Sequence, residues 1–378
     1  MKVDLAPDLQ AMRRAVREFA QTVAKPRAAA VDLEHRFPRE AVDGCRELDL
    51  MGMLVPPEYG GAGLDHVAFC VCIEELAAAC ASTAVIVDVH NSVACEPILL
   101  FGTEQQKRDW LPQLASGRVL GAFALTEPVA GSDAAALETA ARRQADEYVL
   151  TGRKAFITNA GCAGLYVVFA RTGAAGARGI SAFLVPGDAH GLHIGQVFSK
   201  MGLNGSPTGE IVLDEVRVPA AALLGGEGEG FRIAMRALDS GRIGISAQAL
   251  GIARAALEEA TSYITEREQF GQPVASFQGV AFMLADMATR WEAARLLTYH
   301  AAELCAQGRP FTREASMAKL FTTDAAMEIA IDAVQLAGGY GYVSDYPFER
   351  HLRDVKATQI YEGSNQIQRV VIARELLR

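Results

Sequence analysis

The chain has 378 residues, half of which are hydrophobic, and its formal net charge is −9 at pH 7. At about 150 residues per domain, this length predicts two or three domains or layers, and the apolar share is enough for a large core. The sequence contains no basic block and no interleaving of aromatic and basic residues, so we expect no nucleic-acid partner.

Seven cysteines are scattered along the chain, without a Cys-x-x-Cys pair or a His at zinc-like spacing. We expect reduced, buried thiols in a cytoplasmic protein, and no metal site. The N-terminus carries neither an apolar signal-peptide core nor an Arg/Ser-rich transit peptide. No apolar run is expected to reach the ~20 residues that a membrane-spanning helix needs, so we expect no membrane insertion.

Residues 1–115 are predicted to be helical. Apolar residues recur at spacings of three and four between Leu9 and Val23, which is the pattern of an amphipathic helix. Prolines separate the helices that follow. The segment from Val67 to Leu100 is mostly apolar or small, which predicts largely buried helices.

The pattern changes near Gly117. Short runs of strand-forming residues, bounded by turn signals such as Thr151-Gly152, follow one another without intervening helices. These runs cover 148–150, 154–158, 165–170, 180–185 and 210–219. Such a succession predicts an antiparallel barrel or sandwich at about 117–225.

The helical period returns after a glycine-rich run at 225–230. Long helices are predicted over 231–270, 280–307 and 312–337, and long antiparallel helices form bundles. The predicted fold class is therefore α+β. It comprises an N-terminal helical domain at 1–116, a central antiparallel β-barrel at 117–225 and a C-terminal helical bundle at 226–378.

Two segments of the β module suggest a binding site for a flat ligand. Phe123–Asp133 offers a Thr hydroxyl, a Ser hydroxyl and backbone amides beside a glycine, which can hold the edge of a planar heterocycle. In the strand at 154–159, Phe156 and Thr158 share one face and can cover such a ligand. The alternatives are an interdomain turn and an ordinary half-buried strand.

Three further segments belong to the long helices. Arg267 lies near a helix end marked by glycine, and guanidinium groups suit phosphate through paired hydrogen bonds. Gln335–Tyr342 has three glycines, whose backbone can approach a pyrophosphate closely. Asp239–Arg242 interrupts the first helix with a glycine and leaves room for a substrate. Helix ends and helix packing are the alternatives.

The run Gln359–Arg369 places Glu362 between an aromatic residue and Gly363. Glycine lets the backbone approach a ligand closely. A carboxylate that is removed from water gains basicity, because desolvation disfavours its charged form. Such a group can remove a weakly acidic proton near neutral pH. Considered alone, this stretch can equally be a surface turn.

Taken together and in this order, these motifs resemble the acyl-CoA dehydrogenase family, over essentially the whole chain. The resemblance implies a helical N-terminal domain, a central β-barrel and a C-terminal four-helix bundle. It also implies FAD as cofactor, an acyl-CoA substrate, a homotetramer, and electron-transfer flavoprotein as the electron acceptor.

The resemblance implies a role for each matching residue, with Glu362 as the catalytic base. The expected FAD contacts are Phe123, Leu125, Thr126, Gly131, Ser132, Phe156, Ile157, Thr158, Arg267, Phe270, Gln278, Gln335, Leu336, Ala337, Gly338, Gly339, Ser364, Asn365 and Gln366. The expected substrate contacts are Ser132, Asp239, Ser240, Gly241, Arg242, Tyr361 and Gly363. Among the FAD contacts, Arg267, Gln278 and the run from Gln335 to Gly339 match those that a neighbouring subunit supplies.

Some family members carry the base at the position of Gly241, so the presence of Glu362 implies the short- and medium-chain arrangement. Ser364-Asn365, together with Ser316–Phe321, resembles the isobutyryl-type branch. The region Ala84–Pro97, expected to line the acyl pocket, holds no Arg, which argues against a dicarboxylic substrate. An acyl-CoA oxidase, an enzyme acting on carrier-protein thioesters and a non-catalytic flavin-binding scaffold are the alternatives.

Overall fold

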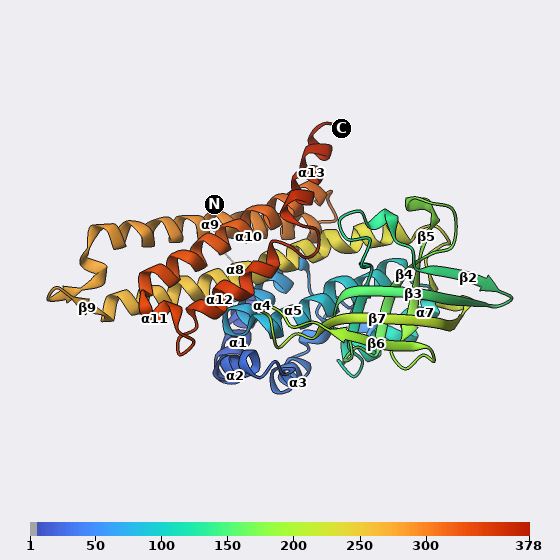
Figure 1. The fold of residues 1–378 in the computed structure, drawn as a ribbon, viewed down its shortest axis with the longest axis horizontal. Coiled ribbons are helices and arrows are strands. Elements are labelled where there is room, and N and C mark those ends of the chain that lie inside the picture. Colours follow the sequence, from blue (N-terminus) through green and yellow to red (C-terminus); the bar gives the residue numbers. More distant parts are fainter. Residues whose placement is uncertain (1–5) are drawn as a thin grey trace.

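The computed structural model describes residues 6–378. Residues 1–5, which the predicted N-terminal domain includes, lie outside the described part. Figure 1 shows an elongated molecule with the sheet at one end and the tips of the long helices at the other. The two predicted helical regions and the β region between them are confirmed.

The N-terminal region is helical, as expected. Its helices are α1 (Pro7–Phe19), α2 (Ala28–Leu33), α3 (Arg39–Glu47), α4 (His66–Ala79), α5 (Ala81–Val89), α6 (Glu96–Phe101) and α7 (Glu104–Ala115). A π-helical segment, His90–Cys95, joins α5 to α6. Nearly every residue from α4 to the start of α6 is buried, which confirms the expected buried helices.

One stretch in this region, Ala81–Phe101, is long and apolar enough to cross a membrane by length and composition, with a mean hydropathy of 1.5 over its most apolar window. The expectation that no apolar run reaches this length is therefore wrong. In the structure 83% of that window is buried. Its apolar character is explained by packing in the core.

The β region is one eight-stranded sheet in the order β6-β7-β3-β2-β4-β5-β8, with β1 beside β4. The strands are β1 (Gly121–Ala124), β2 (Ala140–Gln144), β3 (Glu147–Thr158), β4 (Leu165–Arg171), β5 (Ile180–Pro186), β6 (Leu192–Val197), β7 (Thr208–Pro219) and β8 (Leu223–Leu224). The sheet is mixed rather than purely antiparallel, because β4 pairs in parallel with both β1 and β2. The long connections that precede β4 allow these parallel pairs.

The turn expected at Thr151-Gly152 does not exist. Strand β3 runs through it, with a register shift against β7 between Leu150 and Gly152. A Cβ at Gly152 would collide with the Thr139 side chain and backbone. The glycine therefore allows a close approach of β3 to the segment that leads into β2.

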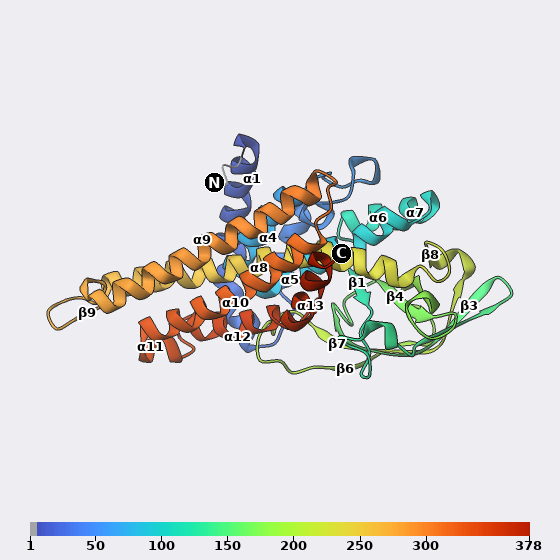
Figure 2. The ribbon, with the colours of Figure 1, turned by 90° about the horizontal axis from the view of Figure 1, so that it is seen from above.

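The C-terminal region contains α8 (Gly230–Glu266), α9 (Gln278–Ala306), α10 (Thr312–Ala337), α11 (Gly339–Tyr342), α12 (Phe348–Thr358) and α13 (Asn365–Leu376). A hairpin of β9 (Glu268–Gln269) and β10 (Gln272–Pro273) joins α8 to α9. Figures 1 and 2 show α8, α9 and α10 running side by side. The glycine in Asp239–Arg242 does not interrupt α8, which continues through it.

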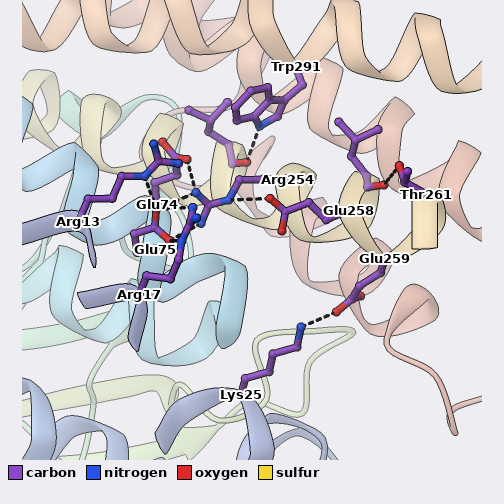
Figure 3. Close-up of polar contacts among 12 residues, drawn as sticks. Arg13, Arg17, Lys25, Glu74, Glu75, Arg254, Glu258, Glu259, Thr261 and Trp291 are labelled. Atoms are coloured by element: carbon purple, nitrogen blue, oxygen red, sulfur yellow. Dashed lines mark hydrogen bonds and ion pairs between the residues drawn. The ribbon is translucent and has the colours of Figure 1, made fainter. Parts of the chain in front are cut away.

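A buried ion cluster ties α8 to α4 and α1 (Figure 3). Arg254 on α8 donates to Glu74 at 2.8 Å and to both carboxylate oxygens of Glu75 at 2.7 and 2.6 Å. Arg13 and Arg17 of α1 also donate to Glu75, at 2.7 and 2.9 Å. Three cations therefore surround one carboxylate, and they hold its pKa down to about 2 although burial alone would raise it.

Replacing Arg254 with Met should destabilise the protein by roughly 3–5 kcal/mol, because it leaves buried carboxylates without their main partner. Glu74 would lose the Arg254 guanidinium and keep the Tyr299 hydroxyl, which donates to it at 2.8 Å. Urea unfolding at one fixed protein concentration measures the change. The matched control is Arg290→Met, which removes partly exposed ion pairs to Glu328 and Asp332 and should cost about 0–1 kcal/mol. Equal losses in the two variants would contradict this account.

Candidate active site

Glu362 lies in the short turn between α12 and α13. Its φ is +53° and that of Gly363 is +90°, a left-handed conformation that non-glycine residues rarely adopt. Two side chains hold the turn by its carbonyls: Lys319 Nζ donates to Gly363 O at 2.9 Å, and Gln368 Nε2 donates to the same oxygen at 2.8 Å. A strained residue that its surroundings fix in this way is typical of a functional site.

The Glu362 carboxylate lies directly against α8 at Gly241. A Cβ at this position would collide with Glu362 Oε2 and Oε1. Any other residue here would therefore push the carboxylate away. Gly241 therefore makes room for the Glu362 side chain, whereas the sequence suggested that it leaves room for a substrate.

The electrostatics of Glu362 favour a base that works near neutral pH. Both carboxylate oxygens are buried, and neither has a hydrogen-bond partner within residues 6–378. Burial raises the pKa of Glu362 to about 7, and the charges of Arg242 and Lys319 limit that rise. Burial likewise lowers the pKa of Lys319 to about 7, although Glu362 opposes this shift.

The predicted substrate contacts on α8 lie beside this carboxylate and are buried. Arg242 Nη1 donates to Asp239 Oδ1 at 2.6 Å and lies 3.4 Å from Ser316 Oγ. Thr312 also donates to Asp239, at 2.6 Å. Asp239 therefore offsets the charge of Arg242 next to the site. Ser240 Oγ lies 3.1 Å from both His66 Nε2 and Arg236 Nη1.

Tyr361 completes the inner wall of the turn. Its hydroxyl makes a short hydrogen bond to Gln248 Oε1 on α8. Burial raises the pKa of Tyr361 well above its usual value, so the phenol stays protonated and donates. Ser132, the remaining predicted substrate contact, is exposed in the loop after β1.

The predicted flavin segments of the β region adjoin one another, because Ala155 N donates to Thr126 O at 2.9 Å. Phe156 has a φ of +58° in an irregular stretch of β3 between Lys154 and Ile157. Phe156 is 65% exposed, and its ring stacks on that of Phe198 with the two ring centroids 4.8 Å apart. Gly131, Ser132 and Phe156 are exposed, Phe123, Thr126 and Thr158 are partly buried, and Leu125 and Ile157 are buried.

The other predicted flavin contacts lie at the opposite end of the same chain. Arg267 and Gln278 flank the β9–β10 hairpin, and Phe270 lies in its turn. Gln335–Gly339 covers the end of α10 and the start of α11 (Figure 1). α8 has 37 residues, so it separates its two ends by about 55 Å at 1.5 Å per residue. One chain therefore does not bring the two groups together. Of the second group, Leu336 and Ala337 are buried, whereas Phe270 is 94% exposed.

Of the last predicted flavin contacts, Gln366 is exposed, but the Asn365 side chain points into the core. Asn365 bonds to Lys319 at 2.9 Å, Thr323 at 2.8 Å and Asp324 at 2.7 Å. Ser364 caps α13, where its hydroxyl accepts from Ile367 N. These two side chains therefore hold the turn that carries Glu362.

Sequence reasoning assigned no role to Lys319, Gln368 or Asp88. A lone Lys or Asp within a mostly apolar helical run was the available signal for Lys319 and Asp88. Glu127 in the predicted flavin segment is buried and pairs with the buried Lys154 at 2.8 Å. It also accepts from the backbone amides of Glu138 and Thr139.

Three family models match successive parts of the chain. They are the N-terminal domain of acyl-CoA dehydrogenase at residues 6–118, the middle domain at 122–216 and the C-terminal domain at 228–377. An acyl-CoA dehydrogenase of Bacillus subtilis is 52% identical, covering 97% of both chains. The mitochondrial short-chain specific acyl-CoA dehydrogenase of Bos taurus is 49% identical, covering 100% of this chain and 92% of the relative.

Solved structures agree with these relatives. Butyryl-CoA dehydrogenase from Megasphaera elsdenii superimposes with a TM-score of 0.98 at 43% identity, over the full length of both chains. A chain from a structure of the electron-transferring flavoprotein of Acidaminococcus fermentans also gives 0.98, at 47% identity and full coverage of both. The chain therefore belongs to the acyl-CoA dehydrogenase family, and it is an FAD-dependent oxidoreductase that acts on acyl-CoA.

Proposed function

We propose that this protein converts a short- or branched-chain acyl-CoA to the trans-2-enoyl-CoA, with Glu362 as the base that removes the α-proton. The observation that carries the proposal is the Glu362 carboxylate, which is buried and without a hydrogen-bond partner in residues 6–378, on a strained turn against Gly241. A pKa of about 7 suits a base that must be ionised yet strongly proton-accepting near neutral pH.

The α-proton of a thioester is too weakly acidic for an ordinary carboxylate, so the developing enolate needs fixed donors at its oxygen. We assign one of these donors to the backbone amide of Glu362, whose left-handed turn is held by Lys319 and Gln368. Tyr361 and Gly363 would contact the acyl thioester, and Asp239–Arg242 would bound the site on α8. Closing these groups around the thioester excludes water and strengthens each interaction.

The residues of the β region fit FAD. Gly131 has open space where a Cβ would stand, so a ligand can approach its backbone closely. Phe156 presents an exposed ring from a strained position beside Thr158. FAD supplies the acceptor for the hydride that leaves the β-carbon, so the bound cofactor carries the redox chemistry.

The second group of FAD contacts implies an assembly. Arg267, Phe270, Gln278 and Gln335–Gly339 lie about 55 Å along α8 from the β region, so we propose that they serve the FAD of a neighbouring subunit in a homotetramer. Gly338 and Gly339 have open space at their Cβ positions, as close approach to a pyrophosphate requires.

We propose electron-transfer flavoprotein as the acceptor of the electrons. The support is that a structure of the electron-transferring flavoprotein of Acidaminococcus fermentans includes a chain that is 47% identical to this one. For the substrate, a relative named short-chain specific supports a short acyl group. The isobutyryl-type pattern of Ser364-Asn365 and Ser316–Phe321 adds branched acyl groups to the candidates. Three observations distinguish the alternatives. An acyl-CoA oxidase would reoxidise its reduced flavin rapidly in air, and an enzyme specific for carrier-protein thioesters would reject free acyl-CoA. The flavin absorbance of a non-catalytic scaffold would not bleach when acyl-CoA is added.

Replacing Glu362 with Gln should slow anaerobic flavin reduction by at least ~10²–10⁴, because the variant keeps the size of the side chain but loses the base. FAD content and acyl-CoA binding should stay near the wild-type values. Glu127→Gln is the control, since Glu127 pairs with Lys154 and should affect folding or FAD binding instead. Near wild-type reduction by the Glu362 variant in a single-turnover experiment would contradict the assignment.

The rate of flavin reduction at low substrate should rise with pH through a midpoint near 7, because Glu362 accepts a proton only when ionised. The charge of Lys319 lowers the pKa of Glu362. Lys319→Gln should therefore move the midpoint to higher pH. Stopped-flow absorbance between pH 5.5 and 9 measures both profiles, and a flat profile for the wild type would count against Glu362.

Replacing Arg267 with Met should weaken FAD binding roughly 10- to 100-fold, the loss expected for a charge-assisted hydrogen bond. The variant should also dissociate into smaller species at higher protein concentration, because FAD stabilises the assembly that binds it. Fluorescence titration and analytical ultracentrifugation measure the two effects. Arg143→Met, an exposed arginine on β2, is the control. Tight FAD binding by an isolated monomer would contradict the shared site.

A further inference from the structure

The helical run from α5 to α6 carries a polar stripe of Asp88, Ser92 and Glu96. Ser92 Oγ donates to Asp88 Oδ1, and both Asp88 and Glu96 contact α8, at Gly244 and Arg236. All three are buried. The run is otherwise so apolar that it resembles a membrane-spanning helix in composition, and a buried carboxyl costs free energy unless it is paired.

This stripe faces α8 next to the proposed base. A Cβ at Gly244 would collide with the Asp88 carboxyl group, as a Cβ at Gly241 would collide with that of Glu362. Gly241 and Gly244 are three residues apart, and such positions lie about 5–6 Å from each other on one helix face. The carboxyl groups of Asp88 and Glu362 therefore lie about one helical turn apart over the same side of α8.

Glu96, at the other end of the stripe, has cationic partners. Its Oε1 accepts from Arg236 Nη2 at 3.2 Å, and its Oε2 lies 3.7 Å from His66 Nε2. Ser240 joins this group, since it lies 3.1 Å from both His66 and Arg236. The carboxylate of Glu96 is thus held within a network of structural contacts.

Asp88 has no such network. Its Oδ1 accepts from Ser92 Oγ at 3.0 Å, and its Oδ2 is buried without a hydrogen-bond partner in residues 6–378. Burial, together with the nearby charge of Glu362, raises the pKa of Asp88 well above its usual value. An apolar side chain would fill this position in the core without these costs. A buried acceptor without a partner calls for an explanation, and a hydrogen-bond donor bound beside Glu362 would supply the missing partner.

We propose that Asp88 is a specificity-determining residue that selects a short acyl group bearing a hydrogen-bond donor, a hydroxyl or an ammonium, beyond its β-carbon. This inference rests on the proposed function, because it places the α-carbon at Glu362. A plain alkyl chain leaves Asp88 Oδ2 unpaired, and an acyl group ending in a carboxylate would place a second negative charge near that of Glu362. A site built to bond a polar group discriminates strongly against an analogue that lacks it.

The test compares anaerobic flavin reduction by butyryl-CoA and by freshly prepared 4-hydroxybutyryl-CoA and 4-aminobutyryl-CoA. With the wild-type holoenzyme, at least one donor-bearing substrate should reduce the flavin roughly 10- to 100-fold faster than butyryl-CoA at low concentration, because the bond to a buried acceptor is made only there. Asp88→Asn should keep part of the advantage of the hydroxyl and lose that of the ammonium. In the Asp88→Val variant, butyryl-CoA should reduce the flavin faster than either donor-bearing substrate.

The control is Asp354→Asn, which alters a buried carboxyl on α12 whose Oδ1 accepts from Leu203 N. The substrate ratio should not change in this variant. If butyryl-CoA reduced the wild-type flavin as fast as or faster than both donor-bearing substrates, the inference would be overturned and the proposed function would stand. This comparison uses the wild type alone, so it does not depend on whether a variant folds. Failure of every acyl-CoA to reduce the flavin would overturn both.

Discussion

The contact on which the site depends is that between the Glu362 carboxylate and the backbone of α8 at Gly241. The absence of a side chain there lets a charged group settle against a buried helix, where no hydrogen bond in the described chain satisfies it. Its raised pKa follows from that burial. On the same helix, the Arg254 cluster ties α8 to α4 and α1. One helix therefore carries both a structural ion cluster and the glycine against which the proposed base packs.

The length of α8 explains why the site is distributed. One end of the helix adjoins the sheet with its candidate flavin segments, and the other end carries Arg267 and the hairpin (Figure 1). A straight helix of this length does not fold back on itself. The proposed completion of the cofactor site by a second copy rests on this geometry, and such a shared site would couple cofactor binding to assembly.

The sequence was a reliable guide where a periodic pattern reported burial. The bounds of the long helices were predicted to within a few residues, and those of α10 matched at both ends. The C-terminal end of α10 is marked by Gly338, which adopts the positive φ of a helix end. The strand pairing was missed, since parallel contacts of β4 with β1 and β2 join segments distant in sequence. Glu362 was proposed as the base from its motif, and its role as the base stays a prediction. The partners that give it its properties, Lys319, Gln368 and Gly241, are close only in three dimensions, and the isolated charge of Asp88 became meaningful only beside Gly244.

The central claim is that Glu362 removes the α-proton, and proton removal can be observed apart from hydride transfer. An acyl-CoA with α-hydrogens but no β-hydrogen, such as 3,3-dimethylbutyryl-CoA, cannot complete the oxidation. Incubated with the holoenzyme in D₂O and followed by NMR, it should incorporate deuterium at the α-carbon with the wild type and not with the Glu362→Gln variant. Exchange at the wild-type rate in the variant would show that another group takes the proton, and the account of the site would be wrong.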